Sequence, residues 1–324
     1  MVICQKLQMK ILKIHFWGVR GSIPSPILSS QIQAKINAVV QRITPQDLES
    51  FDSRERFVAN LPDWIYGTVG GNSPCIQLVT DEGKELILDA GSGIRVMGKN
   101  STIPEDNHYS FFFSHFHWDH ICGLPFFDFA FNPNVKIDIY SPFEHAREFL
   151  AQQMPSVNLF PVLWENFSRN FEFHTMEPGV TYTIDGIQVT SCKVSHPGDS
   201  YSYSFVDGSK KFVYATDIEL MDMGDCNEEH LEAVFRDADV VVLDSQYTLE
   251  EAQSKEKWGH SAFCYAIDFA VKMNIKNVYL YHHEPTYDDK KLNSILSAAK
   301  WYSAYISQNK INVELAVEGA DVEI

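Results

Sequence analysis

Residues 111–120 read Phe-Phe-Phe-Ser-His-Phe-His-Trp-Asp-His, and this stretch decides the fold of the chain. The apolar run that leads into it, Tyr109 to Phe113, is typical of a buried strand. Three histidines and an aspartate follow within six residues, and each would need a polar partner if it were buried. Imidazole nitrogens and a carboxylate packed this closely suit a metal ion such as zinc. The stretch therefore predicts a metal site at the end of a buried strand, the plainer alternative being a strand end with hydrogen-bonded histidines.

Apolar strands that stop at a histidine or an aspartate recur along the chain. An earlier strand ends at Asp89, and later ones end at His196, Asp217, Asp244 and the pair His282-His283. Polar residues at the ends of neighbouring strands meet along one edge of a sheet, where α/β proteins present their chemistry. The sequence therefore predicts one shared site. Its candidate metal ligands are His115, His117, Asp119, His120, His196, Asp217 and either His282 or His283.

The His-x-His-x-Asp-His pattern at 115–120 resembles the signature of the metallo-β-lactamase superfamily. Three further segments resemble the branch that contains ribonuclease Z and the cyclic-phosphate and cyclic-nucleotide phosphodiesterases: FWGVRGSIP at 16–24, GGNSPC at 70–75 and LILDAGSGI at 86–94. The resemblance runs from about Lys13 to Pro285. It implies a four-layer αββα sandwich of the α/β (α+β) class, with two β-sheets face to face and helices outside.

The resemblance also implies two divalent metal ions and a division of the ligands between them. His115, His117 and His196 would bind one ion, Asp119, His120 and the last histidine would bind the other, and Asp217 would bridge the two. We prefer His282 as the last ligand because it follows its strand at the family's ligand position, so that His283 would lie behind it. Asp89 and Asp244 are the expected acceptors for imidazole N–H groups.

The chemistry that this resemblance implies is hydrolysis by a metal-bound hydroxide, with zinc as the preferred ion and manganese or iron as alternatives. Asp119 is expected to act both as a ligand and as the acceptor of a proton from the attacking water. The substrate that we expect is a small or cyclic phosphodiester. A thioester or lactam hydrolase of the same fold and a metal-binding sensor without turnover are the alternatives.

The segment Trp258-Gly259-His260-Ser261 favours phosphodiester chemistry. It opens a helix that precedes the strand to His282, an order similar to that of ribonuclease Z relatives. In those proteins the histidine contacts the phosphate and helps to protonate the leaving oxygen. We expect the same of His260, at the positive end of the helix where an anion is favoured. The alternative is that His260 only caps the first turn.

Composition limits the class of partner and the compartment. The net charge of −17 disfavours a long nucleic acid, since binding its phosphates usually requires a Lys/Arg surface. No apolar run approaches the roughly 18–20 residues that span a bilayer, and the N-terminus lacks the apolar core of a signal peptide. Six scattered cysteines are typical of free thiols in a reducing compartment, so we expect a cytoplasmic protein. Whether Met1 or Met9 is the natural start, and whether the chain forms a homodimer, stay open.

The 324 residues are expected to form a single domain, 1–324, with a helical insertion at 27–65. Apolar residues there recur at helical spacing, and the insertion is expected to be a lid or else a helical pair on the edge of the fold. Asp185-Gly186 and Asp207-Gly208 each predict a hairpin. Residues 159–173 are rich in aromatic residues and are not assigned to an element.

Overall fold

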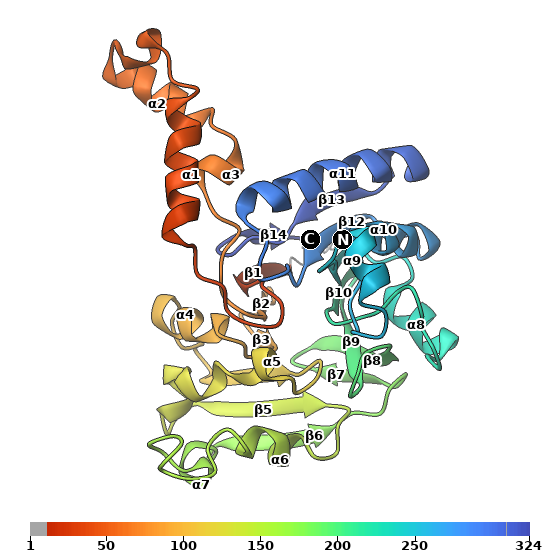
Figure 1. The fold of residues 1–324 in the computed structure, drawn as a ribbon. Helices are drawn as coiled ribbons and strands as arrows, with labels where there is room; N and C mark the ends of the chain where they lie inside the picture. The colour runs from red at the N-terminus through yellow and green to blue at the C-terminus, as the bar shows by residue number, and fades with distance from the viewer. Residues whose placement is uncertain (1–11, 309) are drawn as a thin grey trace, which may run out of the picture.

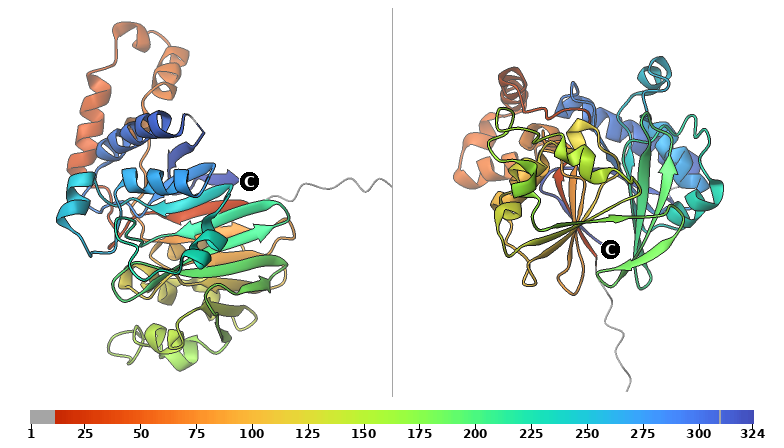
Figure 2. Two further views of the ribbon diagram at one scale, coloured as in Figure 1. Left: turned by 90° about the vertical axis from the view of Figure 1, so that its right-hand side faces the viewer. Right: turned by 90° about the horizontal axis from the view of Figure 1, so that it is seen from below.

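The computed structural model describes residues 12–308 and 310–324, and in them two seven-stranded sheets face each other with helices on both outer faces (Figures 1 and 2). The first sheet has the order β14 (Asp321–Glu323), β1 (Lys13–Gly18), β2 (Cys75–Val79), β3 (Glu85–Leu88), β4 (His108–Phe112), β5 (Lys136–Ser141) and β6 (Phe171–Thr175). The second has the order β13 (Asn312–Leu315), β12 (Asn277–Tyr281), β11 (Val240–Asp244), β10 (Lys210–Ala215), β9 (Ser200–Asp207), β8 (Ile187–Val194) and β7 (Thr181–Ile184). The predicted αββα sandwich is confirmed.

The direction of the strands explains why the histidines and aspartates predicted at their ends come together. In the first sheet β3, β4 and β5 are mutually parallel, and in the second β10, β11 and β12 are. Strand β8 runs in the same direction as β10, because both pair antiparallel with β9. The carboxyl ends of these strands therefore open on one edge of the sandwich, as expected for ligand sites in α/β folds.

The helices form the two outer layers. The first sheet is flanked by α4 (Gly93–Asn100), α5 (Trp118–Ile121), α6 (Ala146–Ala151) and α7 (Trp164–Phe167), with the 3₁₀ turns η2 (Leu124–Phe126) and η3 (Asp128–Phe131). The second is flanked by α8 (Glu228–Phe235), α9 (Leu249–Ser254), α10 (Phe263–Lys272) and α11 (Asp289–Ser307). None of the helices in the described part of the chain is both long and apolar enough to span a bilayer.

The phenylalanine run that leads into the metal motif contributes to two apolar cores. Phe112 faces the second sheet, where its ring lies 5.2 Å from that of Phe205. Phe111 and Phe113 face the opposite way, and Phe111 lies 5.9 Å from Phe127 in the core beneath the outer helices. A strand that is buried on both faces reads as a continuous apolar run, which is why three phenylalanines stand in succession at 111–113. This double burial fixes the end of β4, and with it the start of the motif.

The predicted insertion is helical and stands away from the body as an arm (Figures 1 and 2). It contains α1 (Ser29–Val40), η1 (Pro45–Leu48), α2 (Phe51–Ala59) and α3 (Asp63–Tyr66). Lys35 holds its base to the body through an ion pair of 2.5 Å with Asp289 of α11. The apolar positions that predicted α1 are largely solvent-exposed, since Ile32, Ile36 and Val40 are 45%, 57% and 64% exposed. A role as a lid stays a prediction.

Some elements and expectations differ from the sequence reading. Residues 159–173 contain α7 and the start of β6, and the chain beyond Pro285 adds α11, β13 and β14. Strand β14 returns to pair antiparallel with β1, with Lys13 opposite Glu323. Both predicted hairpins are present, as β7–β8 and β9–β10. The five cysteines in the described residues are free, whereas Cys4 and Met9 lie outside them.

Candidate metal centre

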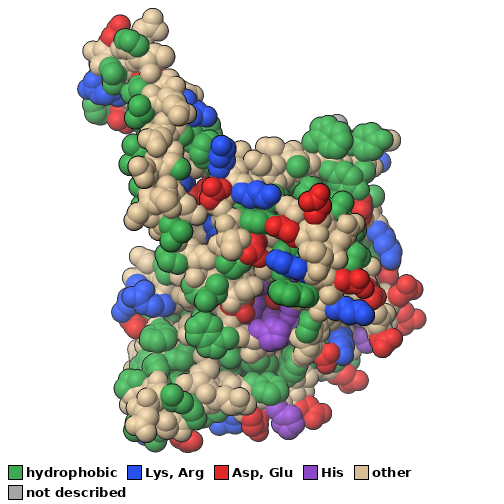
Figure 3. Space-filling model, in the orientation of Figure 1, with side chains coloured by type: hydrophobic (Ala, Val, Ile, Leu, Met, Phe, Trp, Pro, Cys, Tyr) green, Lys and Arg blue, Asp and Glu red, His purple; other side chains and the backbone are tan. Residues whose placement is uncertain are grey.

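The structure brings all of the predicted site residues to one edge of the sandwich. They lie in the loop after β4 (His115 and His117), in α5 (Asp119 and His120), after β8 (His196), after β10 (Asp217), before α10 (His260) and after β12 (His282). Most of these side chains are buried, whereas His117 is exposed. Figure 3 shows histidine surface near the middle of the face turned to the viewer, between hydrophobic and charged side chains. The cluster is therefore accessible from solvent on one side.

The ligand atoms fall into two groups. Those of His115, His117, His196 and Asp217 lie within 4.8 Å of one another, and so do those of Asp119, His120 and His282. Asp217 faces both groups with different oxygens. Its Oδ1 lies 3.7 Å from Nε2 of His115, and its Oδ2 lies 3.1 Å from Nε2 of His120. A carboxylate in this position can bridge two cations.

Hydrogen bonds from the second ring nitrogen fix the tautomer of several histidines. Nδ1 of His120 donates to Asp89 at 2.7 Å, and Nδ1 of His282 donates to Gln246 at 3.1 Å. Nδ1 of His196 donates to the carbonyl of Gly259 at 2.9 Å. In the neutral form of each ring the lone pair then lies on Nε2, which faces other members of the cluster and is the usual metal-binding atom of ligand histidines.

The buried Nε2 atoms of His115 and His120 support the presence of a cation. Neither atom makes a well-directed hydrogen bond, although buried polar atoms are nearly always paired. Nε2 of His120 instead lies between two carboxylates, 3.1 Å from Asp217 and 3.3 Å from Asp119. Burial disfavours a charged imidazole, yet the carboxylates of Asp119 and Asp217 outweigh it and raise the pKa of His120 well above its usual value. The same two carboxylates that attract a proton would attract a metal ion. The donor set of imidazoles and carboxylates fits zinc and related divalent ions.

Burial would raise the pKa of Asp217, but the imidazoles of His282, His120 and His115 hold it well below its usual range. The carboxylate is therefore ionised in the fold. Asp89, Asp217 and His282 share a left-handed backbone, with φ of 56°, 51° and 60°. Such angles are uncommon outside glycine and typical of functional sites.

Asp89 connects the two sheets behind the site. Besides His120, it accepts hydrogen bonds from the backbone N–H and the hydroxyl of Ser114 and from the hydroxyl of Tyr214, at 2.7–2.8 Å. Its side chain is fully buried. The expectation that Asp89 supports a ligand rather than binding the metal itself agrees with these contacts.

We expect Asp89→Ala to lower the free energy of unfolding by about 3–5 kcal/mol, because removal of one partner leaves several buried donors unpaired. Metal affinity should also fall by about 10–100-fold, as is typical when the partner of a ligand histidine is lost. Urea unfolding and metal titration measure the two effects. Asp81→Ala, which removes an exposed carboxylate from the neighbouring loop, should change stability by less than about 0.5 kcal/mol. Equal behaviour of the two variants would contradict the assigned role.

His260 belongs to neither predicted ligand set, although its ligand atom lies within 4.8 Å of those of Asp217 and His282. Its Nδ1 donates to Asp244 at 2.8 Å, and its ring stacks on His282 with 4.9 Å between centroids. The loop that carries it is held by Glu219, which accepts the backbone N–H of Gly259 at 2.9 Å. Gly259 has a φ of 85°, and a Cβ there would lie 2.1 Å from Nδ1 of His196. The loop can approach the site only because this residue is glycine.

Sequence reasoning missed several supporting residues. Gln246, which orients His282, lies two residues beyond the end of β11, and its proximity to that strand end is the only signal for it. Tyr214 was read as a strand residue, and Glu219 was not singled out. Asp244 binds His260 at 2.8 Å and lies 3.5 Å from Nδ1 of His282, so its main partner is not a predicted ligand. The side chain of His283 points elsewhere and donates from Nε2 to the carbonyl of Ala316.

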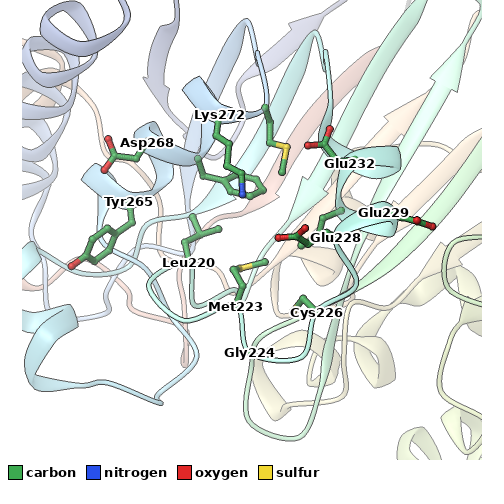
Figure 4. Close-up of a pocket in the computed structure, with 13 residues that line it drawn as sticks. Leu220, Met223, Gly224, Cys226, Glu228, Glu229, Glu232, Tyr265, Asp268 and Lys272 are labelled. Atoms are coloured by element: carbon green, nitrogen blue, oxygen red, sulfur yellow. The ribbon is translucent and has the colours of Figure 1, made fainter.

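A groove of about 830 Å³ between α8 and α10 is separate from this centre (Figure 4). Leu220, Met223 and Phe269 form much of its apolar lining, and Glu228 and Lys272 are among its charged residues. None of the predicted site residues lines it.

Comparisons with known proteins agree with this geometry. A family model described as a beta-lactamase superfamily domain matches residues 85–283. A protein named ribonuclease Z from Picrophilus torridus is 23% identical over 296 residues, which cover 77% of this chain and 93% of that protein. The metallo-β-lactamase fold protein YhfI from Bacillus subtilis superposes with a TM-score of 0.63 at 16% identity, over 97% of this chain and 100% of that one. A diphosphatase from the PhnP family superposes with a TM-score of 0.62 at 18% identity, over 98% of both chains.

Proposed function

From the premise that this chain belongs to the metallo-β-lactamase superfamily, we propose that it is a two-metal phosphodiesterase acting on a small or cyclic phosphodiester. The observation that carries the proposal is the position of Asp217, whose two oxygens face two separate groups of ligand atoms. Metal-dependent phosphoryl transfer commonly uses two ions a few ångströms apart, held by such a shared carboxylate.

The ligands of the two ions follow from the two groups. His115, His117 and His196 would hold one ion, Asp119, His120 and His282 would hold the other, and Asp217 would contribute an oxygen to each. When bound, divalent ions supply Lewis acidity: they stabilise negative charge on a phosphoryl oxygen and make water more acidic. Zinc suits these donors best, and manganese or iron is compatible with them.

Asp119 accepts the proton of the attacking water. Burial would raise the pKa of its carboxyl, but His120 outweighs burial and holds that pKa well below its usual value. The carboxylate is therefore ionised and can accept a hydrogen bond. Its Oδ2 lies 3.3 Å from Nε2 of both His120 and His282, so it is fixed among the ligands. A carboxylate held in this way can orient a water for attack.

His260 binds the phosphate and protonates the leaving oxygen. Burial lowers the pKa of its imidazole, but the carboxylates of Asp244 and Asp217 outweigh this and the pKa is raised overall. The bond from Nδ1 to Asp244 leaves Nε2 as the nitrogen that can donate to substrate. A charged donor in this position is suited to general-acid catalysis.

Residues around the centre support a compact substrate with an apolar or aromatic part. Trp118 and Trp258 are 63% and 61% exposed and are close in sequence to His117 and His260. The ammonium of Lys255 lies 4.0 Å from the ring centre of Tyr247, whose ring lies 5.7 Å from that of His260. A cation and aromatic surfaces beside the site suit one phosphate and one ring system. The net charge of −17 would repel a long polyanion.

Metal analysis followed by a substrate panel tests the proposal. We expect about two tightly held divalent ions per chain and metal-dependent hydrolysis of bis(p-nitrophenyl) phosphate. At least one member of the cyclic nucleotides and cyclic ribose phosphates should be a better substrate, whereas nitrocefin and a thioester should react slowly. A chelator should abolish the activity and added zinc restore it. Fast thioester or nitrocefin hydrolysis without phosphodiester hydrolysis would refute the proposal.

A further inference from the structure

A second cluster of potential metal ligands lies on β4, β5 and β6 of the first sheet. His108 is the first residue of β4, Asp138 lies in β5, and His174 lies in β6. We propose that these three residues, with Glu172, form a structural site for a divalent transition metal such as zinc. This site is independent of the catalytic metals and of the reaction proposed above.

The register of the parallel strands places the ligands on one face. Asp138 pairs with Ser110 of β4 and with Glu172 of β6, so alternate residues His108 and His174 share the same face. Nε2 of His108 lies 2.7 Å from Oδ2 of Asp138, and Nε2 of His174 lies 3.0 Å from its Oδ1. Ligand atoms of Asp138, Glu172 and His174 lie within 4.8 Å of one another. His108 is not in that group and joins it only through its contact with Asp138. Together the four residues would offer zinc two imidazoles and two carboxylates.

Neighbouring residues orient both imidazoles. Nδ1 of His108 lies 3.7 Å from Oδ1 of Asp185, and Asp185 is itself held by a hydrogen bond of 2.5 Å from the hydroxyl of Ser110. The ring of His174 stacks on that of Tyr140, with 4.7 Å between centroids and 17° between planes. Contacts of this kind, on the ring face or on the second nitrogen, fix a ligand histidine before the metal binds.

The charge around the cluster is not neutralised by fixed cations. A hollow of about 240 Å³ beside it is lined by Lys136 and Arg169, together with Asp138 and Glu172. Asp138 contacts the imidazoles of His108 and His174. Among the described residues, neither Asp138 nor Glu172 forms an ion pair with Lys136 or Arg169. The side chains of His108 and Asp138 are 20% and 23% exposed, which allows an ion to enter. A hydrogen-bonded His–Asp–His group without a metal is the competing interpretation.

A bound ion would add side-chain links between strands that already pair through their backbones. It would tie β4, β5 and β6 together, and through Asp185 it would also reach the turn between β7 and β8 in the second sheet. The role would be structural, because His108 is the first residue of β4, whereas the catalytic histidines come after the last residue of that strand.

Zinc counting on the whole protein tests the site. Wild-type protein and the variants His174→Gln and His108→Gln/His174→Gln are equilibrated with buffered zinc, desalted and analysed by mass spectrometry. We expect one zinc ion fewer per chain in the double variant, with the hydrolytic rate unchanged. The matched control is His145→Gln, because His145 also faces a carboxylate, Glu148 at 3.9 Å, but on an exposed helix without a second histidine.

Histidine ¹⁵N spectra provide a second measurement that does not depend on variants. Zinc should shift the Nε2 resonances of His108 and His174, as expected on coordination, and leave those of His145 unchanged. Equal zinc content in wild type and the double variant, or unshifted Nε2 resonances at saturating zinc, would overturn the proposal. The proposed reaction fails in a different way: the protein would bind the two catalytic ions but hydrolyse no phosphodiester. That result does not depend on how much zinc His174→Gln binds.

Discussion

Asp217→Ala is expected to abolish hydrolysis and to release the catalytic metals. Among the described residues, Asp217 is the one whose carboxylate faces both ligand groups. In the proposed two-metal site its loss would remove a ligand from each ion and leave two dications close together without a shared anion. Several kcal/mol of transition-state stabilisation depend on those ions, and each 1.4 kcal/mol corresponds to a tenfold change in rate. We therefore expect kcat/KM to fall about a thousandfold or more. Steady-state kinetics and metal analysis of the same preparation measure both effects.

Asp199→Ala is the matched control for this variant. Asp199, in the turn between β8 and β9, is also left-handed, with a φ of 69°, but its side chain is 48% exposed and pairs with Lys193 at the surface. It should keep both metals and full activity. If Asp217→Ala kept more than about a tenth of the wild-type rate with both ions bound, the bridging role would be refuted.

His260→Ala has the second largest expected effect. Because His260 belongs to neither ligand set, the variant should keep both metals, while kcat falls about 10²–10⁴-fold, the usual contribution of a general acid. The loss should depend on the leaving group. Substrates that release an alkoxide need the proton and should show the full loss, whereas bis(p-nitrophenyl) phosphate, with its good leaving group, should show much less.

The partner of His260 offers an independent check. Asp244→Asn removes the carboxylate that accepts the proton of Nδ1, so it should lower kcat in the same leaving-group-dependent manner but to a smaller extent. His145→Ala, on an exposed part of the surface, serves as the control for loss of a histidine. An equal loss with both classes of leaving group would contradict a role in proton donation. Undiminished activity of His260→Ala would favour thioester or lactam hydrolysis.

Much of the centre could be predicted because its ligands stand at strand ends. An apolar strand that stops at a histidine or an aspartate is a pattern visible in a short stretch of sequence. His196, Asp217 and His282 are predicted from this pattern. The preference for His282 over His283 agrees with the geometry, since the side chain of His283 bonds to Ala316. Parallel strand direction then brings the ends together.

The supporting residues could not be predicted in the same way, because their partners are distant in sequence. Tyr214 bonds to Asp89, which is 125 residues away in the sequence. His260, just before α10, bonds to Asp244 only because the fold places α10 beside the end of β11. The second cluster was hidden for the same reason. His108, Asp138 and His174 lie on three strands of which the last fell in an unassigned aromatic region, so no local pattern connects them.

The pairing of β14 with β1 has a consequence for synthesis of the chain on the ribosome. His15 of β1 bonds to Asp321 of β14, 306 residues later. At roughly 5–20 residues per second, the ribosome needs roughly 15–60 s to produce the intervening chain. During that interval one edge of β1 lacks its partner, and an unpaired edge is a template for association with other chains. Among the described strands, β1 waits longest for its neighbour, so its edge stays unpaired while most of the sequence is synthesised.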